Sequence, residues 1–563
     1  MSKNTEFDAI VVGSGISGGW AAKELTEGGL TVLMIERGRN VERGKDYVTE
    51  GKNPWELPFR GFGDHKEFAQ DYPVQSRGPM NEYNQHFWVK DTESPYGIDD
   101  DKPFNWFRGY QLGGRSLTWG RQSLRRSPQD FEANKNDGHG VDWPIRYEDI
   151  APWYDYVEEF IGVSGRAEGA EQIPDGRFQP AMPLNCVEEH LKKSLVENFP
   201  GRVMTVGRTA NLTQALPGRS PCLFRHNCSR GCSWGGYFST QSSTLPVAQA
   251  TGRLTTMTGQ RVVRINYDEA TKRASGVVVK DENTGDEKTV SSKIVFLCAS
   301  TFNTLQLLLN SKSAVFPNGL ANTSGVLGKS IMDHTFAAGA MGRVPGFEDK
   351  KTNGRRPTYS IIFPFRNTAI DETKVPFLRS YMLAINAVQT GWDRGAIMPG
   401  VGASFKDDLS KPGPWMASIF MMGEVLPDKR NFVELDYNNL DPLGQPQLKI
   451  NFQYRENEKL MAKDAAEQCS ELLLASGGHK TGGSDQLLTP GSSIHEMGGA
   501  PMGRDPSTSI LNAYNQCHDV QNVFITDGAA MSSSSSQNPS LTYMALTARA
   551  AKYAVEMVKG GKI

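Results

Sequence analysis

The sequence predicts an α/β protein that opens with a Rossmann-like dinucleotide-binding unit and continues into a second, substrate-covering domain. At the N-terminus, a short apolar run is followed by a glycine-rich turn and a helical pattern. Strand-like runs return from about residue 255, and further runs alternate with a long helical segment between residues 335 and 490. With 563 residues, 38% of them hydrophobic, the chain can bury the cores of two or more domains.

The N-terminal unit has a strand, a helix and a second strand predicted at residues 7–12, 20–25 and 31–35. In the first turn, Gly13 allows the tight bend, Gly15 lets the backbone approach a pyrophosphate, and Gly18 lets helix and strand pack closely. Glu36 follows the second strand, where a carboxylate that binds ribose hydroxyls is expected, and Arg37 beside it is a further cofactor-binding candidate. The unit therefore predicts dinucleotide binding, with a plain glycine-rich turn as the alternative.

The same periodicity and turn signals predict the later strands, helix and hairpin turn. Strands are predicted at residues 261–267, 274–279, 293–297 and 359–363, a helix at residues 458–475, and a hairpin turn at residues 283–286. Residues 39–107 are rich in Pro, Gly and aromatic side chains without periodicity and are expected to be long excursions over the cofactor domain.

The charge balance and the hydropathy exclude several classes of partner. The 61 basic and 63 acidic residues give no broad attraction to nucleic acid or anionic lipid, so a small substrate fits better. No apolar stretch approaches the roughly twenty residues of a transmembrane helix, and the N-terminus has no signal-peptide core. On these grounds alone the chain is expected in the cytoplasm.

Four further segments carry a resemblance. They are residues 108–120 with Gly113, Gly114, Ser116 and Trp119, residues 298–311, residues 328–334, and His495 followed by Asn538 forty-three residues later. Together they resemble the glucose-methanol-choline (GMC) oxidoreductases, flavoproteins that oxidise alcohols, over nearly the whole chain. The resemblance implies an FAD-binding domain at residues 1–145, 205–333 and 491–563. It also implies a substrate domain at residues 146–204 and 334–490, with an antiparallel sheet covered by helices.

The resemblance also implies cofactor contacts. Gly113 and Gly114, with Ser116, would lie near the flavin ring, Val262 would contact adenine, and Asp527 with Gly528 would meet the cofactor at a strand end. Thr118 stands where pyranose oxidases carry the histidine that bonds covalently to FAD, so non-covalent FAD is expected. Trp119 is similar to the sugar-oxidising branches and favours a carbohydrate substrate.

His495 is the candidate catalytic base, because alcohol oxidation needs a group that removes the hydroxyl proton while hydride goes to flavin N5. An ordinary histidine pKa of about 6.5 leaves the ring able to accept a proton near neutral pH. Asn538 would orient the same hydroxyl. Asn538 and Pro539 also predict an N-cap and a first helical residue, with the helix dipole directed at the flavin.

Cys222, Cys228 and Cys232 are three of the seven cysteines and lie in one short loop at residues 221–236. This spacing is similar to the loop that holds a three-iron, four-sulfur cluster in bacterial FAD-dependent sugar dehydrogenases. The alternatives are reduced thiols, one disulfide with a spare thiol, or a zinc site that includes His226.

The sequence therefore predicts an FAD-dependent dehydrogenase that oxidises ring C3 or C1 of a sugar or glycoside and passes electrons through the cluster to a c-type cytochrome or a quinone. Relatives travel to the periplasm with a small signal-bearing subunit, so periplasmic co-export and a cytoplasmic location are both expected possibilities. The alternatives are a sugar oxidase of the pyranose oxidase type, a non-redox flavoprotein, an electron carrier, or an NAD enzyme if the first loop is considered alone.

Overall fold

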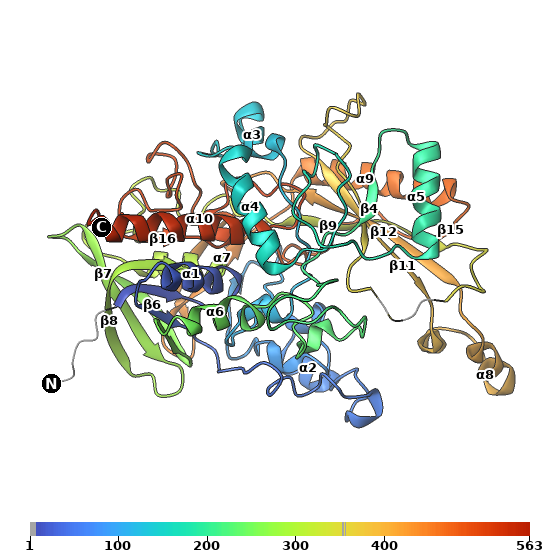
Figure 1. The fold of residues 1–563 in the computed structure, drawn as a ribbon, viewed down its shortest axis with the longest axis horizontal. Helices are drawn as coiled ribbons and strands as arrows, with labels where there is room; N and C mark the ends of the chain where they lie inside the picture. Colours follow the sequence, from blue (N-terminus) through green and yellow to red (C-terminus); the bar gives the residue numbers. More distant parts are fainter. Residues whose placement is uncertain (1–6, 352–353, 355) are drawn as a thin grey trace.

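A computed structural model describes residues 7–351, 354 and 356–563 of the chain. It contains a seven-stranded sheet, a six-stranded sheet and a smaller three-stranded sheet. Figure 1 shows the two large sheets toward opposite ends of the longest axis, with helices packed around both. The predicted α/β class is confirmed. Among the described helices, none is long and apolar enough to cross a membrane.

The seven-stranded sheet has the strand order β5-β2-β1-β8-β7-β6, and β16 also pairs with β8. Its strands are β1 (Phe7–Val12), β2 (Val32–Ile35), β5 (Leu254–Met257), β6 (Gln260–Asp268), β7 (Arg273–Asp281), β8 (Glu287–Leu297) and β16 (Val523–Ile525). The last half of β8 runs parallel to β1 and β16, whereas its first half forms an antiparallel hairpin with β7. The predicted strands at residues 261–267, 274–279 and 293–297 and the turn before β8 are confirmed.

The parallel strands end together at one edge of this sheet. Val12 pairs in register with Ile35 and Leu297, Ile35 pairs with Met257, and Ile525 pairs with Leu297. The residues that follow these strands, among them Gly13, Glu36 and Asp527, therefore meet at the carboxyl edge. In open α/β sheets, that edge is where ligands bind.

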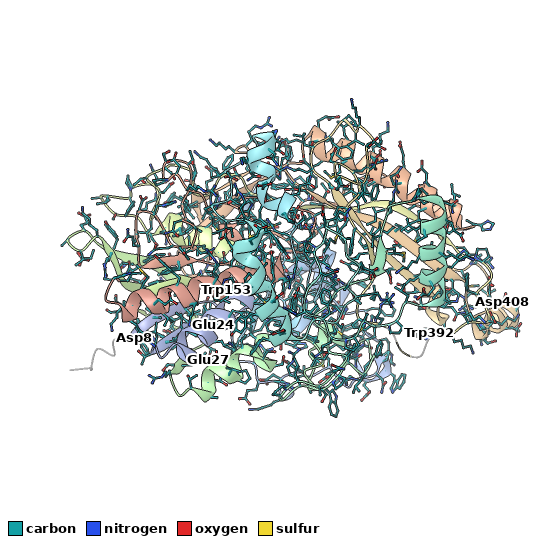
Figure 2. The ribbon with its side chains drawn as sticks, turned by 45° about the horizontal axis from the view of Figure 1, so that its top comes forward. Asp8, Glu24, Glu27, Trp153, Trp392 and Asp408 are labelled. Atoms are coloured by element: carbon teal, nitrogen blue, oxygen red, sulfur yellow. The ribbon has the colours of Figure 1, made fainter. Side chains whose placement is uncertain are left out.

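Helices cover the faces of this sheet. They are α1 (Ile16–Glu27), α4 (Tyr147–Ile161), α6 (Thr244–Ala250), α7 (Thr301–Asn310) and α10 (Ser540–Lys559). Helix α1 packs against α10 and α6, and α10 packs against α4. The buried Lys23 of α1 joins α1 to α4, because its Nζ contacts Glu24 at 2.8 Å, Glu27 at 2.7 Å and the Tyr156 hydroxyl at 2.6 Å. Figure 2 labels Glu24 and Glu27 on α1 and Trp153 on α4.

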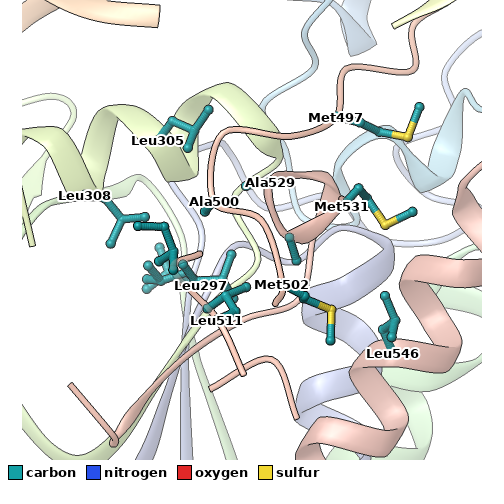
Figure 3. Close-up of a cluster of buried hydrophobic side chains, with 14 of the residues drawn as sticks. Leu297, Leu305, Leu308, Met497, Ala500, Met502, Leu511, Ala529, Met531 and Leu546 are labelled. Atoms are coloured by element: carbon teal, nitrogen blue, oxygen red, sulfur yellow. The ribbon is translucent and has the colours of Figure 1, made fainter. Parts of the chain in front are cut away.

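A buried hydrophobic cluster fills the space between β8, α7 and α10. Leu297 ends β8, Leu305 and Leu308 project from α7, and Leu546 lies on α10, all fully buried (Figure 3). Met497, Met502 and Met531, from the loops between α9 and α10, complete the same cluster. Burying a side chain of this size stabilises the fold by about 1.5–3 kcal/mol. The loops that carry the candidate site are therefore anchored by this buried cluster.

The six-stranded sheet is antiparallel and has the order β15-β9-β12-β11-β10-β4. Its strands are β4 (Met204–Val206), β9 (His334–Arg343), β10 (Ser360–Ile362), β11 (Tyr381–Gln389), β12 (Trp415–Glu424) and β15 (His479–Gly482). Helix α9 (Glu456–Ala475) packs on β9 and β12, and α5 (Cys186–Asn198) packs on α9. The strand predicted at residues 359–363 and the helix predicted at residues 458–475 are confirmed.

Two elements lie close to the predicted division between domains. Strand β4 spans the predicted boundary between residues 204 and 205 and pairs with β10 of the six-stranded sheet. Helix α4, which the sequence places in the substrate domain, packs against α10 beside the seven-stranded sheet. The division into two domains stays a prediction.

The remaining elements are short. They are α2 (His65–Asp71), α3 (Pro128–Asp137), α8 (Gly402–Ser410) and the small sheet of β3 (Gly97–Ile98), β13 (Phe432–Leu440) and β14 (Pro446–Asn451). The 3-10 turns include Pro54–Glu56, Gln75–Arg77, Gln85–Phe87, Gly114–Leu117, Cys228–Arg230, Thr240–Ser242, Trp392–Ala396 and Gly528–Ala530. Helix α8 projects from the end of the molecule that holds the six-stranded sheet (Figure 1), where Figure 2 labels Trp392 and Asp408.

Candidate active site

A cavity of about 550 Å³ lies between the carboxyl edge of the seven-stranded sheet and the six-stranded sheet. Gly13, Glu36 and Asp527 line it from the first sheet, and Phe336 of β9 and Met422 of β12 line it from the second. A concave site of this size, with an apolar lining and a few convergent polar groups, is typical of cofactor binding.

The three glycines of the first turn have different surroundings. Gly13 has a φ of +95°, and a Cβ there would lie 2.5 Å from the Cys298 carbonyl oxygen. A Cβ at Gly18 would lie 2.0 Å from the Gly13 carbonyl oxygen, whereas one at Gly15 would meet no atom within 4 Å. Gly13 and Gly18 are therefore required by the protein's own packing. Gly15 faces the cavity at the N-terminus of α1, where backbone amides and the helix dipole favour an anion.

Glu36 and Arg37 both line the cavity. Glu36 accepts hydrogen bonds from Ser14 Oγ at 2.6 Å, Ser14 N at 3.1 Å and Gly38 N at 2.9 Å. Burial raises the pKa of Glu36, and these three bonds act in the opposite direction. Oε2 accepts both bonds from Ser14, and Oε1 accepts only the one from Gly38, so Oε1 still has a lone pair for a ribose hydroxyl. Arg37 pairs with Glu282 at 2.9 Å and stacks on the Tyr110 ring at 3.9 Å.

The second glycine segment packs directly on the first. Gly113 has a φ of +96°, its N–H donates to Ser14 Oγ at 2.9 Å, and its carbonyl accepts from Ser116 Oγ at 2.5 Å. A Cβ at Gly114 would lie 3.1 Å from Gly15 Cα. Gly114 and Ser116 line the cavity, as does Val262 of β6, while Gly113 and Gly18 stand behind the lining.

Asp527, Gly528 and Pro539 also line the cavity. Asp527 accepts from Thr304 Oγ1 at 2.5 Å and from Ala529 N at 3.0 Å, and burial raises its pKa to about 6. Helix α10 begins at Ser540 with Pro539 as its N-cap, so the predicted N-cap at Asn538 is wrong by one residue. Pro539 caps the helix without a side-chain hydrogen bond. Ser540 lines the cavity, so the positive end of the α10 dipole faces it.

The structure brings His495 and Asn538 together at the cavity wall. The Asn538 amide nitrogen lies 3.2 Å from His495 Nε2, and both residues line the cavity. The hydroxyl of the half-buried Tyr359 interacts with the Asn538 side chain. Burial first, and then the charges of His334 and Arg115, hold the pKa of His495 well below its ordinary value. A neutral imidazole with an amide beside it is therefore directed at the cavity.

Two neighbouring residues hold His495 from behind. Its Nδ1 lies 2.8 Å from His334 Nδ1, and its backbone N–H donates to Asp333 at 3.2 Å. Asp333 also accepts from Gly491 N at 2.8 Å and from the Ser493 hydroxyl, so it fastens the loop that carries His495. Burial raises the pKa of Asp333 to about 6.

Comparison with known proteins decides the family. The sequence model described as GMC oxidoreductase matches residues 7–336, and a second model with the same description matches residues 427–547. The chain belongs to the GMC oxidoreductases. It is accordingly an FAD-dependent oxidoreductase that acts on CH–OH donors.

Relatives of this GMC oxidoreductase cover nearly its whole length. The 2-methyl-1,2-propanediol dehydrogenase of Mycolicibacterium austroafricanum is 28% identical, over 97% of this chain and 95% of the relative. The fructose dehydrogenase large subunit of Gluconobacter japonicus is 24% identical, over 100% of both chains. A solved structure of an Aspergillus oryzae formate oxidase variant has 15% identity and a TM-score of 0.65 over 100% of both chains, which shows the shared fold.

Four residues of the GMC site were not predicted from the sequence. Arg115 lines the cavity and pairs with the buried Glu496 at 3.0 Å. Tyr359, the residue before β10, also lines the cavity. His334 lies behind His495 without lining the cavity. Arg115 stands inside the predicted segment 108–120, and Glu496 follows His495, so proximity in sequence was a signal for these two. Nothing in the sequence places Tyr359 or His334 beside Asn538 and His495.

The three cysteines of the predicted cluster loop line one small cavity of about 30 Å³. All seven cysteines are free, which contradicts the alternative of a disulfide with a spare thiol. Among the described residues, no group of three or more His, Cys, Asp or Glu side chains is placed to hold a metal ion, so neither the zinc alternative with His226 nor the predicted iron-sulfur cluster is shown. Gly236 N donates to Cys232 Sγ at 3.3 Å.

Proposed function

We propose that this GMC oxidoreductase oxidises a ring hydroxyl of a sugar or glycoside, at C3 or C1, with His495 as the base. The observation that carries the proposal is the 3.2 Å contact between His495 Nε2 and the Asn538 amide at the wall of the cofactor cavity. His495 takes the hydroxyl proton, and the carbon-bound hydrogen leaves as hydride, so the substrate loses two electrons and becomes a carbonyl compound. FAD, when bound, supplies N5 as the hydride acceptor.

Asn538 orients the reacting hydroxyl in this mechanism. In this proposal, one amide hydrogen faces His495 and the second donates to the substrate oxygen. Asn538 Oδ1 is buried without a hydrogen-bond partner of good geometry, which leaves an acceptor for a neighbouring substrate group. Tyr359, the residue before β10 of the six-stranded sheet, supports the amide. The pair thus fixes the hydroxyl relative to the base.

The cavity suits FAD held without a covalent bond. Gly15 and the N-terminus of α1 would meet the pyrophosphate, Glu36 the ribose, Val262 the adenine, and Gly114 with Ser116 the flavin side. Open space at the Gly15 Cβ position supports the pyrophosphate assignment. A histidyl link to FAD needs an imidazole ring, and Thr118 has none. Among the described residues of the lining, His495 is the only histidine.

Two observations favour a sugar substrate. Trp119, Tyr359 and Phe336 line the cavity, and aromatic faces suit the apolar faces of a pyranose ring. The fructose dehydrogenase relative is named for a sugar. The propanediol dehydrogenase relative favours a second candidate, a short branched diol. A dye-linked assay over a panel of sugars, glycosides and diols, with the product position read by NMR, decides between them.

We also propose a three-iron, four-sulfur cluster at Cys222, Cys228 and Cys232. Three free thiols share one cavity, and the Gly236 N–H bond to Cys232 Sγ is of the kind that tunes cluster sulfurs. The cluster would take single electrons from the reduced cofactor.

The surface around this loop supports an acceptor or partner subunit there. Leu223 and Trp234 of the loop are 55% and 51% exposed. The loop is tied to the segment around Glu50 by an Asn227 bond of 2.8 Å, and that segment exposes Trp55 and Phe62. Exposed large apolar side chains are found at protein interfaces when they gather on one surface. The proposal includes a c-type cytochrome or a quinone as the acceptor and a small signal-bearing subunit as a partner. It also includes co-export to the periplasm with that subunit, with a cytoplasmic location as the alternative.

Replacing His495 tests the catalytic part. The variant His495→Ala is expected to keep FAD, seen in its visible absorption, and to slow flavin reduction by substrate by about 10²-fold or more. His518→Ala is the matched control, because His518 bonds to Ser509 away from the cavity. Flavin reduction at the wild-type rate in His495→Ala would remove His495 from the mechanism.

Replacing Cys228 tests the electron exit. Cys228→Ser is expected to lose iron and its paramagnetic signal, to keep the rate of flavin reduction, and to slow reduction of external cytochrome c. Cys186→Ser, a partly exposed cysteine outside the loop, is the control. A sugar oxidase would instead release hydrogen peroxide and contain no iron in the wild-type protein.

A further inference from the structure

His334 makes two contacts that together fix its protonation pattern. Its Nε2 lies 2.8 Å from the Ser535 carbonyl oxygen, and its Nδ1 lies 2.8 Å from His495 Nδ1. A carbonyl oxygen only accepts hydrogen bonds, so His334 Nε2 must carry a hydrogen. The ring is fully buried, and burial lowers its pKa to about 4, so it is neutral near pH 7. The neutral ring then has a lone pair at Nδ1.

The same reasoning determines which ring nitrogen of His495 carries a hydrogen. Because His334 Nδ1 can only accept, the 2.8 Å contact requires a hydrogen on His495 Nδ1. A neutral His495 then has its lone pair at Nε2, the nitrogen 3.2 Å from the Asn538 amide. Hydrogen bonds therefore run in one direction, from Asn538 through both rings to the Ser535 carbonyl. Free neutral histidine prefers its hydrogen on Nε2, so this arrangement holds His495 in the less favoured tautomer.

We propose that His334 is a positioning residue that fixes His495 in the Nδ1–H tautomer and so directs a proton-accepting Nε2 into the cavity. His334 does not line the cavity, and it acts through His495 without touching the substrate. The inference rests on the proposed function only for its catalytic consequence. The tautomer itself is a property of the hydrogen-bonded chain and is measured without turnover.

The fold specifies this arrangement from three separate segments. His334 is the first residue of β9, His495 lies on the loop fastened by Asp333, and Ser535 belongs to the buried serine loop at residues 532–536. The backbone at Ser535 has a φ of +56°, a conformation that a non-glycine residue adopts only where its surroundings hold it. Arg126 holds that loop by donating to the Ser533 and Ser534 carbonyl oxygens at 2.9 and 2.7 Å. The acceptor for His334 is thus held in place.

Nitrogen-15 NMR of histidine-labelled holoenzyme tests the tautomer directly, because a ring nitrogen with a hydrogen and one with a lone pair have distinct shifts. The His495 signals are identified by their loss in His495→Gln. The expected result is a hydrogen on Nδ1 and a lone pair on Nε2 in the wild-type protein. A wild-type His495 with its hydrogen on Nε2 would overturn the proposal, whatever the variants do.

Two variants test the consequence. His334→Leu removes the acceptor and is expected to shift His495 toward the Nε2–H form, to lower kcat by about 10²-fold, the scale of base catalysis, and to change KM less than threefold. His334→Asn offers an amide oxygen to His495 Nδ1 and is expected to restore the tautomer and most of kcat. His190→Leu is the matched control, because His190 Nε2 also faces a carbonyl, that of Ser476, outside the cavity.

The outcomes separate this inference from the proposed function. An unchanged tautomer and unchanged kcat in His334→Leu would overturn the role of His334 while leaving His495 as the base. Full flavin reduction in His495→Gln would overturn the base assignment, and the NMR result on the His495 tautomer in the wild-type protein would still stand. If His334→Leu does not fold, the wild-type spectrum and His334→Asn still decide.

Discussion

At the scale of single residues, the protonation of His495 determines the useful pH range. Burial, His334 and Arg115 hold its pKa well below 6.5, and the neutral ring is the form that accepts a proton. An exposed histidine would become protonated, and so stop acting as a base, as pH falls through about 6.5. His495 stays neutral in that range, because its pKa is held well below 6.5. We expect kcat/KM for a neutral sugar to remain level through pH 6.5 and to fall only at distinctly lower pH.

Stopped-flow flavin reduction under anaerobic conditions, from pH 8 downward, measures this directly. A half-loss of kcat/KM near pH 6.5 would show that His495 is solvated and not buried as the structure has it.

The glycines of the first turn give a second prediction at this scale. Gly18→Ala brings a Cβ against the Gly13 carbonyl oxygen at 2.0 Å, so the backbone must move, and we expect the free energy of unfolding to fall by about 1–3 kcal/mol. Gly15→Ala meets no atom within 4 Å, and its φ of −67° suits alanine. That variant is expected to keep the stability of the apoprotein and to bind FAD at least tenfold more weakly.

Thermal unfolding of the two apoproteins and FAD titration of each check the pair. Equal FAD affinity in Gly15→Ala and wild type would place the pyrophosphate elsewhere in the cavity.

At the scale of elements, Arg126 joins the start of the α3 region to the serine loop before α10. Its fully buried guanidinium donates to Ser533 Oγ at 3.2 Å and to the Ser533 and Ser534 carbonyl oxygens. Arg126→Met leaves these acceptors without a partner, and each buried unsatisfied group costs about 1–3 kcal/mol. We expect lower stability together with slower flavin reduction, because the same loop carries the acceptor for His334 and the approach to Asn538.

Arg430→Met is the control, since the Arg430 side chain is 71% exposed and pairs with Asp428 at the surface. Chemical unfolding and flavin reduction of both variants provide the measurement. An Arg126→Met protein that matches the control in both would show that the serine loop holds its own conformation.

The elements also show why some of the fold was predictable and some was not. The β1–α1–β2 unit was predicted because strand period, glycine positions and helix pattern are local properties of residues 7–35. Residues 39–107 gave no pattern because distant partners hold them. The buried Gln75, for example, bonds to Asp91 and to the Trp106 carbonyl and accepts from Arg108 N. Local periodicity carries no information about such contacts.

The site shows the same limit. Gly13, Glu36, Asp527, His495 and Asn538 stand in recognisable segments and were predicted, and they line one cavity. From the sequence, His334 is only part of the segment 328–334 that resembles the GMC family, because its role depends on a carbonyl 201 positions later in the chain. Tyr359 reaches Asn538 through the pairing of β10 with its neighbours, which no sequence period specifies.

At the scale of the whole molecule, FAD is expected to join the two large sheets, because their residues line the same cavity. Binding to the folded state alone adds stability of about 2.7 kcal/mol when free FAD is one hundred times its dissociation constant. We therefore expect the apoprotein to unfold at a lower temperature than the holoenzyme and the midpoint to rise as FAD is added. Thermal scans at increasing FAD concentration test this, and a midpoint independent of FAD would contradict it.

Strand β16 completes the parallel part of the first sheet, and it pairs with β8 although more than two hundred residues separate them in the chain. During synthesis on the ribosome, β1, β2, β5 and β8 all emerge long before β16, Asp527 and Asn538. A nascent chain consequently presents an unpaired edge of β8 and only part of the wall of the cavity. The wall of the FAD cavity is therefore complete only after β16, Asp527 and Asn538 have left the ribosome and joined the strands made earlier.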